Sequence, residues 1–387
     1  MPMIRMLTAN TAEVDDPEFA VEEILAQLKL AENLQKNSVG ILTCHPECLE
    51  TGVVKAVCDS LPFDVVGCTT FACGTPQNQG LTNLSLSVLT SDDVHFAARS
   101  SAPLHLENYR APMDEAYKAA AAELPGEPVM AFAFPPMVQF VNSDVLVGAL
   151  NAVFGSLPVF GTLPSDHTKN YSKNSVIFNG ESSQDCMSML VFSGPVEPRF
   201  FMISILEQKL QNQNALITES EGCVVRRVND MPILKYLETI GLCEDQDMSV
   251  MKVVPFVVNY NDGTPPVTYG IYHFMPDGNA LFGGVIPENA TISVGAMETE
   301  DVVGTMRQIL ESIMELPQVN GLLLFSCICR GWALGMNPLL EIEEVGNVVG
   351  NLPYHVSYSG GEICPVTNEQ GQVFNRFHNY TCIVCAL

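Results

Sequence analysis

The sequence predicts an α/β fold, with α+β as the alternative, built as two lobes of mixed β-sheets with helices on the outer faces. The main observation is a pattern that occurs three times: an apolar run, a helical segment, then Leu-Pro before another strand and a small-residue loop. The chain has 387 residues, enough for two or three domains, and 47% of them are apolar. The three copies, over 39–69, 129–165 and 322–361, predict internally repeated strand-helix-strand units.

The first copy is expected to have one helix before its first strand and one after it. Asp16-Pro17-Glu18 predicts the start of the earlier helix, because Asp caps a helix, Pro favours its first position and an acid suits its N-terminus. Apolar spacing extends this helix to Leu30. The other elements expected here are a strand over 39–43, a helix over 49–61 and paired strands over 81–89 and 94–98.

The second copy repeats this order, and a polar stretch follows it. We expect a long loop over 165–174, where no strand pattern is present. The chain turns polar again over 206–215, and we place a domain boundary there. The N-terminal domain is then 1–208, with two units, and the C-terminal domain is 209–387. The expected elements are helices over 113–124 and 143–154 and strands over 129–134, 175–178, 187–192 and 200–205.

The C-terminal half is expected to begin with a strand-rich segment and then enter the third copy. Tyr380 to Cys385 predicts a buried terminal strand, in which thiols act as small apolar groups. The other elements expected before the third copy are helices over 233–242 and 299–316 and strands over 223–228, 253–259, 268–275, 280–283 and 291–296.

Composition excludes several classes of partner. The chain has 18 Lys and Arg against 44 Asp and Glu, a formal charge of −26, so a nucleic-acid partner is not expected. No signal-peptide pattern and no apolar run of about 18 residues is present, so no membrane partner is expected. The 13 cysteines are an odd number in a long chain, which predicts reduced thiols and a cytoplasmic location.

Arg330 is the first candidate binding residue. It follows an apolar strand in the third copy, and a guanidinium at a strand end can bind a ligand carboxylate through two parallel hydrogen bonds. The alternative is a salt bridge that fastens the third unit. The acids that could pair with it are Glu341, Glu343, Glu344 and Glu362.

The loops that end the three copies are the second candidate. Tyr358-Ser359-Gly360-Gly361-Glu362 places two glycines beside an acid, and the equivalent loops are 67–70 and 161–166. If the units are pseudo-symmetric, all three loops lie at one edge and enclose a pocket of small residues, hydroxyls and carboxylates. The alternative for the glycine pair is a simple turn with a solvated Glu362.

Metal, cofactor and nucleophile signals are weak. Cysteine pairs occur at 44/48, 327/329 and 382/385, but no second pair has zinc-ribbon spacing, so we expect no metal and no cofactor. There is no Gly-x-Ser-x-Gly motif and no nucleotide-binding glycine motif. Ser165-Asp166-His167 and the Cys327/Cys329 pair remain the candidates for an enzyme, which is the less favoured class.

The chain resembles the FIST family, named for F-box and intracellular signal-transduction proteins. The C-terminal likeness rests on Leu324-Phe325-Ser326-Cys327 with Arg330, on 359–365, and on Phe377-His378-Asn379-Tyr380-Thr381. The N-terminal likeness rests on Val66-Gly67-Cys68-Thr69-Thr70 and on 157–162 with Ser165-Asp166. It departs from the family at Thr162, where a second glycine is usual, near His355 and Val356, where a glycine is usual, and at 71–74.

The resemblance implies a sensory module that binds a small molecule, such as an amino acid or a small carboxylate, in a pocket between the two domains, and that acts through a signalling partner protein. A protein-interaction scaffold without a small ligand and an enzyme are the alternatives. In the first case Arg330 binds a carboxylate and Asp166 or Glu362 accepts from an amine. The candidate ligand-binding residues are Gly161, Ser165, Asp166, Cys327, Arg330, Tyr358, Gly360, Gly361, Glu362, His378 and Asn379.

Overall fold

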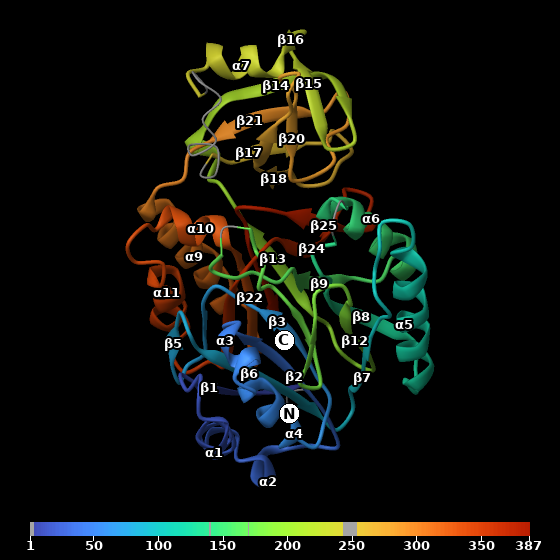
Figure 1. Ribbon diagram of the computed structural model, residues 1–387, viewed down its shortest axis with the longest axis vertical. Coiled ribbons are helices and arrows are strands. Elements are labelled where there is room, and N and C mark those ends of the chain that lie inside the picture. The colour runs from blue at the N-terminus through green and yellow to red at the C-terminus, as the bar shows by residue number, and fades with distance from the viewer. Residues whose placement is uncertain (1–3, 139–140, 169, 243–253) are drawn as a thin grey trace.

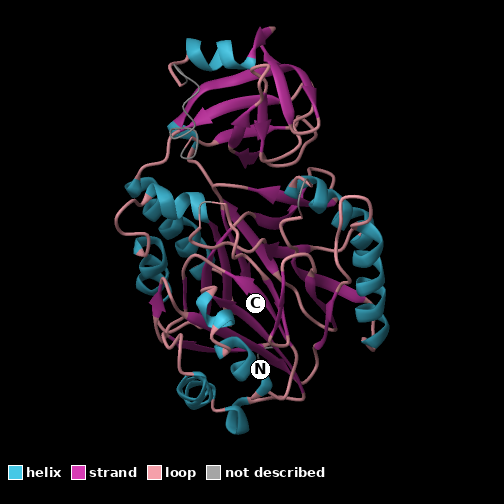
Figure 2. Cartoon of the chain, in the orientation of Figure 1, coloured by secondary structure: helices cyan, strands magenta, loops and turns pink. Residues whose placement is uncertain are grey.

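The computed structural model describes residues 4–138, 141–168, 170–242 and 254–387. It confirms a mixed α/β fold in which helices lie outside mixed sheets (Figures 1 and 2). Each copy of the repeated pattern forms a pair of parallel strands joined by helical segments. The pairs are β2 (Asn37–Cys44) with β3 (Val65–Thr69), β8 (Pro128–Phe134) with β9 (Val159–Thr162), and β22 (Leu322–Cys327) with β23 (Tyr354–Ser359).

The first unit surrounds its parallel pair with strands and short helices. The expected helix over 49–61 is interrupted at Gly52, whose φ of 85° is left-handed and favours glycine. A first strand, β1, was not expected from the sequence. The elements are β1 (Arg5–Thr11), α1 (Pro17–Leu28), α2 (Leu30–Asn33), α3 (Glu47–Glu50), α4 (Val53–Asp59), β4 (Cys73–Gly74), β5 (Gln79–Gly80) and β6 (Leu84–Ser91).

The second unit follows the same order with fuller helices. Its helices are α5 (Arg110–Glu123) and α6 (Ser143–Phe154), and the loop expected over 165–174 has no strand in its described residues. Its other strands are β7 (His95–Ser100), β10 (Val176–Phe178), β11 (Glu181–Ser183) and β12 (Ser188–Ser193).

The third unit begins at β13 (Arg199–Ile203), leaves for a separate β-rich segment, and resumes at α9 (Thr299–Met314). Glu298 and Asp301 form a capping box that starts α9, because each side chain accepts from the other residue's backbone N–H. The remaining elements are α10 (Ile328–Ala333), α11 (Leu340–Val349), β24 (Glu362–Thr367), β25 (Val373–His378) and β26 (Cys382–Ala386).

Each unit contributes a hairpin to the sheet of another unit. The β4–β5 hairpin of the first unit pairs with β23, β10–β11 of the second pairs with β3, and β24–β25 of the third pairs with β9. The exchange is cyclic, so no unit has a complete sheet by itself. The three six-stranded sheets have the orders β1-β6-β2-β3-β10-β11, β25-β24-β9-β8-β12-β7 and β13-β26-β22-β23-β4-β5.

The inner faces of the three sheets pack together in one central core. Alternate residues of β2, β8 and β22 point into it, among them Ile41, Phe132 and Phe325. The outer faces are covered by α1 and α4, by α5 and α6, and by α9 and α11. Strands buried on both faces explain the nearly continuous apolar runs from which the repeats were found.

In its described residues, the segment between β13 and α9 forms an eight-stranded sheet with one α-helix, and we call this segment the β insert (residues 207–295). It lies at one end of the molecule, at the top of Figure 1. Val285 N donates to Asp144 Oδ2 at 2.7 Å, which fastens the insert to α6. Its elements are β14 (Leu210–Glu221), β15 (Val224–Val228), β16 (Met231–Pro232), α7 (Ile233–Thr239), β17 (Phe256–Asn259), β18 (Val267–Tyr269), β19 (Ile271–Phe274), β20 (Ala280–Phe282) and β21 (Thr291–Gly295), after a 3-10 turn over Glu207–Lys209.

The polar stretch at 206–215 is thus where the chain enters the β insert, and much of it belongs to strand β14. Its side chains are largely exposed over 211–214, which explains the polar composition.

His355 is a buried histidine between the first and third sheets. Its Nε2 lies 2.7 Å from Thr43 Oγ1 and its Nδ1 lies 2.6 Å from Ser87 Oγ. Burial lowers the pKa of His355 to about 3, so its imidazole stays neutral in the folded protein.

Stability should therefore fall as the pH is lowered from about 6.5 towards 3, because in that window the unfolded chain binds a proton at His355 that the folded chain excludes. His355→Gln should make the pH dependence of the unfolding free energy shallower by up to about 1.4 kcal/mol per pH unit. Urea unfolding at a series of pH values measures this. Equal slopes for the two proteins would contradict the neutral, buried assignment.

Candidate functional site

The loops that end the three parallel pairs meet and hydrogen-bond to one another. Ser165 N donates to Thr69 O at 3.0 Å, and Ser165 Oγ donates to Tyr358 O at 3.0 Å. Gly360 N donates to Leu163 O at 3.0 Å. The cyclic exchange of hairpins causes this meeting, because each loop must cross from its own sheet to the next. Carboxyl ends of parallel strands are where ligands collect in α/β proteins.

Arg330 does not point into an open site. It is fully buried, and its Nη2 lies 2.7 Å from Glu341 Oε1. Nη2 also donates to Val302 O at 3.1 Å and to Thr305 Oγ1 at 2.9 Å. The guanidinium therefore fastens α10 to α9 and α11, which is the alternative that the sequence left open. Glu341 already occupies the position that a ligand carboxylate would need.

A cavity of about 340 Å³ lies where the β insert meets the three-unit body. The insert contributes β18–β19, the third unit contributes the end of β22, α10 and the β25–β26 turn, and the second unit contributes the segment before α6 and its long loop. The lining residues are Met137, Ser143, Tyr171, Gly270, Ile271, Tyr272, Cys327, Ile328, Cys329, Trp332, Gly360, Asn379 and Tyr380.

Aromatic side chains dominate the larger lining residues. Tyr171 and Trp332 are stacked, with ring centroids 6.5 Å apart and ring planes at 25°. Tyr272 and Trp332 are 49% and 38% exposed, so they face both the cavity and solvent. Trp332 is the single tryptophan of the sequence, so its fluorescence reports on this cavity alone.

Glycines bring the walls close together. A Cβ on Gly270 would lie 2.8 Å from Tyr380 Oη. A Cβ on Gly360 would lie 2.2 Å from Met137 Cε and 2.5 Å from Pro164 O. The second glycine of the Gly360-Gly361 pair has φ 150°, and a Cβ there would lie 2.4 Å from the Phe377 ring of the same unit. Gly360 thus permits the close approach of the second and third units.

No lining residue that the structure describes is an acid, a base or a histidine. Glu362 and His378 are cross-strand partners that lie fully buried beside the cavity residues. Burial raises the pKa of Glu362 well above its usual range, and Ser359 Oγ donates to its Oε1. Burial lowers the pKa of His378 to about 3. Both groups are therefore held in their neutral forms.

Three of the residues predicted from sequence line the cavity: Cys327, Gly360 and Asn379. Asn379 is 4% exposed, and its Oδ1 has no hydrogen-bond partner. Asn379 N donates to Thr268 O at 2.9 Å, so its backbone is tied to the β insert. It is the one lining side chain among the described residues with an unpartnered buried polar atom.

The other predicted residues have different positions. Gly161 lies in β9 against the backbone of β8, and Tyr358 Oη donates to Pro338 O at 2.8 Å. Asp166 accepts from Thr168 N and Oγ1 at 2.5 Å and from Lys173 N at 2.8 Å, so it shapes its own loop. Ser165 joins the loops, and Gly361, Glu362 and His378 are buried outside the lining set.

The enzyme candidates are not assembled into a catalytic arrangement. His167 Nδ1 lies 3.1 Å from His45 Nε2 and the two rings stack, while Asp166 is engaged by its own loop. Burial raises the pKa of the Cys327 thiol well above its usual range, which disfavours the thiolate. Within the described residues no group of three His, Cys, Asp or Glu side chains is placed to hold a metal ion.

Sequence reasoning missed the aromatic lining. Trp332 carried a usable signal, since it is the single tryptophan and lies two residues after Arg330. Tyr171 lies in the loop that was expected to have no regular structure. Tyr272 lies in a strand of the β insert, and nothing in its local sequence shows that this strand faces the third unit.

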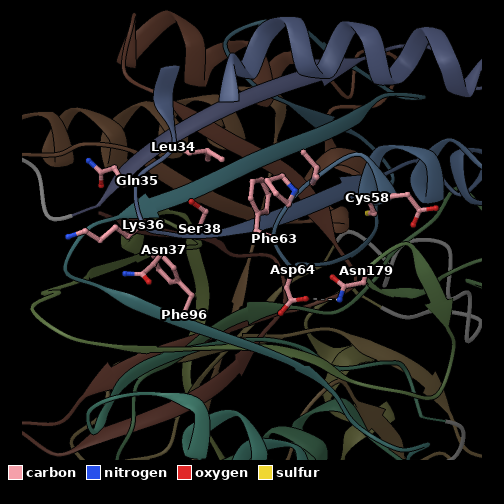
Figure 3. Close-up of a pocket in the computed structure, with 13 residues that line it drawn as sticks. Leu34, Gln35, Lys36, Asn37, Ser38, Cys58, Phe63, Asp64, Phe96 and Asn179 are labelled. Atoms are coloured by element: carbon pink, nitrogen blue, oxygen red, sulfur yellow. Dashed lines mark hydrogen bonds between the residues drawn. The ribbon is translucent and has the colours of Figure 1, made fainter. Parts of the chain in front are cut away.

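A second hollow, of about 770 Å³, lies at the amino ends of β2 and β3 (Figure 3). It is lined by 34–38 and 61–64 with Cys58, Asp59, Phe96 and Asn179, and Asn179 Nδ2 donates to Asp64 Oδ1 at 2.8 Å. The loops that meet one another begin at the opposite, carboxyl ends of these strands, where ligands usually bind in α/β proteins. We therefore take the aromatic cavity as the candidate site.

Comparison with known proteins supplies the family. The sequence pattern of the FIST N domain matches residues 38–231, and that of the FIST C domain matches residues 233–365. The chain belongs to the FIST family. FIST domains are generally taken to be sensory domains of signal-transduction proteins. Among the helices that the structure describes, none has the length and apolar character needed to cross a membrane.

Two further comparisons add little to the FIST assignment. No curated protein matches the sequence. The crystal structure of cyanuric acid hydrolase from A. caulinodans matches with 9% identity and a TM-score of 0.37, over 100% of this chain and 99% of that chain.

Proposed function

We propose that this FIST protein is a sensory module that binds a small ligand in the aromatic cavity between the β insert and the three-unit body. The observation that carries the proposal is the origin of the cavity lining: the β insert, the second unit and the third unit all contribute to it. A ligand there touches all three parts at once. The bound ligand favours the arrangement in which the three parts enclose it, and this shift in conformation is the signal.

The surface of the β insert is the part best placed to pass the signal on. Tyr272 links the cavity to β19. Polar contacts such as Val285 N with Asp144, Arg376 with Asp262 and Asn379 N with Thr268 O hold the insert to the body. When the position of the insert relative to the body changes, the surface available to a signalling partner protein changes with it. We propose that such a partner binds this surface.

The ligand carboxylate that the sequence suggested has no support from the described lining. Arg330 is paired with Glu341, and the lining residues in the described part of the chain include no cation. The proposal therefore keeps a small ligand and gives no binding role to Arg330.

A blocking variant tests the site. Cys329 lines the cavity and is partly exposed, so Cys329→Phe should fill the space, while Cys329→Ser keeps it open. Fractions of a metabolite extract should raise the Tm of the wild type and of Cys329→Ser but not that of Cys329→Phe. No rise for the wild type, or an equal rise for all three proteins, would refute the proposal.

Thiol labelling separates a sensor from a cysteine enzyme. Among the cysteines that the structure describes, Cys186 and Cys329 are partly exposed and the rest are buried. Native alkylation, mapped by mass spectrometry, should label Cys329 and leave Cys327 intact, and an active extract fraction should slow the labelling of Cys329. Rapid labelling of Cys327 would favour the enzyme instead, since it requires an accessible thiolate.

A further inference from the structure

We propose that the ligand of the aromatic cavity is a neutral, planar aromatic molecule with a hydrogen-bond donor, an inference that rests on the proposed function of this site. Three independent properties of the cavity lead to this class: the aromatic walls, the lack of charge and one unpartnered buried acceptor.

The walls favour a flat ring. Tyr171, Tyr272, Trp332 and Tyr380 all line the cavity. The Tyr171–Trp332 stack presents flat faces from two different units, 6.5 Å between centroids. Aromatic rings prefer offset-stacked or edge-to-face contact, so a planar ligand ring extends this arrangement and an aliphatic ring does not.

The lack of charge excludes ions. No lining residue in the described part of the chain is charged, and the adjacent Glu362 and His378 are neutral because burial shifts their pKa values. Arg330 is paired with Glu341. An anion entering this cavity would lose its water and find no cationic partner among the described lining residues, in a protein whose formal charge is −26.

An organic cation is the nearest alternative, because aromatic faces attract cations. It would also need an available carboxylate. Glu362 is kept protonated, and Asp166, whose charge acts on Tyr171, accepts hydrogen bonds from Thr168 and Lys173 through both oxygens. A neutral ligand fits the cavity better.

The unpartnered acceptor defines the polar group of the ligand. Asn379 lines the cavity, and its Oδ1 is buried without a hydrogen-bond partner, which is costly for a polar atom. An N–H or O–H of the ligand satisfies it. The hydrogen bond between Asn379 N and Thr268 O fixes the backbone from which this side chain extends.

A set of four matched probes tests the class. Benzamide is neutral, planar and a donor; benzoate and benzylammonium change its charge, and cyclohexanecarboxamide removes its flat ring. Trp332 fluorescence follows each titration, because no other tryptophan is present. We expect saturable binding of benzamide, with each of the other three at least about tenfold weaker.

Asn379→Leu tests the donor. It should weaken benzamide about tenfold, since a buried polar pair is lost, and leave benzonitrile, which has no donor, unchanged. If this variant does not fold, Cys329→Phe replaces it and must abolish the benzamide response.

The outcomes separate this inference from the proposed function. Tighter binding of benzoate, benzylammonium or cyclohexanecarboxamide than of benzamide overturns the ligand class and leaves the site. The same holds if no probe binds while extract fractions still raise the Tm in a manner blocked by Cys329→Phe. If neither probes nor fractions act on the wild type, both the inference and the proposed function fail.

Discussion

Arg330→Met should lower the free energy of unfolding by about 3–5 kcal/mol, because it leaves Glu341 as an unpaired charge in a fully buried position. Methionine keeps the unbranched apolar stem and removes the guanidinium, so the packing of the stem is retained. Urea unfolding followed by circular dichroism measures the loss. The double variant Arg330→Met/Glu341→Leu should recover most of it, since no buried charge then remains.

Arg307→Met is the matched control. Arg307 lies on α9, the helix that receives Arg330, and its Nε lies 2.6 Å from Oε1 of Glu344 on α11. The Arg307 side chain is 55% exposed and that of Glu344 is 7% exposed. Because solvent reaches this pair from the arginine side, its loss should cost less than loss of the Arg330 pair, about 1 kcal/mol. Equal costs for Arg330→Met and Arg307→Met would show that the buried pair does not fasten the third unit.

Gly67→Ala and Gly161→Ala should each destabilise the protein by about 3 kcal/mol or more, because the added methyl group has no room. A Cβ on Gly67 would lie 1.8 Å from Leu42 O, and one on Gly161 would lie 1.9 Å from Ala133 O. Both contacts are with the backbone of the parallel partner strand, which cannot move without breaking its sheet. Thermal unfolding of the purified variants measures the effect.

Replacing exposed helix glycines by alanine should have the opposite effect on stability. Gly148 in α6 and Gly304 in α9 have no atom within 4 Å of an added Cβ, so alanine there should raise stability by up to about 1 kcal/mol. If Gly67→Ala or Gly161→Ala behaved like Gly148→Ala, the close approach of the parallel strands would be disproved. On the helix-covered face of the third unit, Leu324 and Ser326 lie opposite Val356 and Tyr358, so this approach is specific to two units.

The repeated units could be predicted from sequence because their strands are buried on both faces. Ile41 and Leu42 illustrate this, since one points to the central core and the other to the helices. Apolar runs of this kind are easy to see in the sequence, and Leu-Pro precedes the second parallel strand of each unit. The resemblance to the FIST family, which the family comparison confirms, rests on the ends of these same strands.

The exchange of hairpins could not be predicted. Cys73–Gly74 and Gln79–Gly80 are strands of two residues each, too short to leave a pattern in sequence. They form because β23 offers an unpaired edge, and that edge belongs to a unit almost three hundred residues later. The β insert was hidden for a similar reason: its first strand, β14, is largely exposed over 211–214 and looks like a polar linker.

The candidate site was only partly accessible to sequence reasoning. Cys327, Gly360 and Asn379 were found because they lie in the family signature at strand ends. For Arg330 the sequence offered two interpretations, and only the geometry shows that Glu341, in the first turn of the next helix, pairs with the guanidinium. Tyr272 could not be found, because its place in the cavity depends on how the β insert seats against the third unit.

A crystal structure of the protein purified together with its ligand tests the central claim most directly. Continuous density for a flat molecule should lie between the Tyr171–Trp332 stack and Asn379, within hydrogen-bond distance of Asn379 Oδ1, while Arg330 remains paired with Glu341. Ligand density in the hollow at the amino ends of β2 and β3, or against a released Arg330 guanidinium, would contradict it.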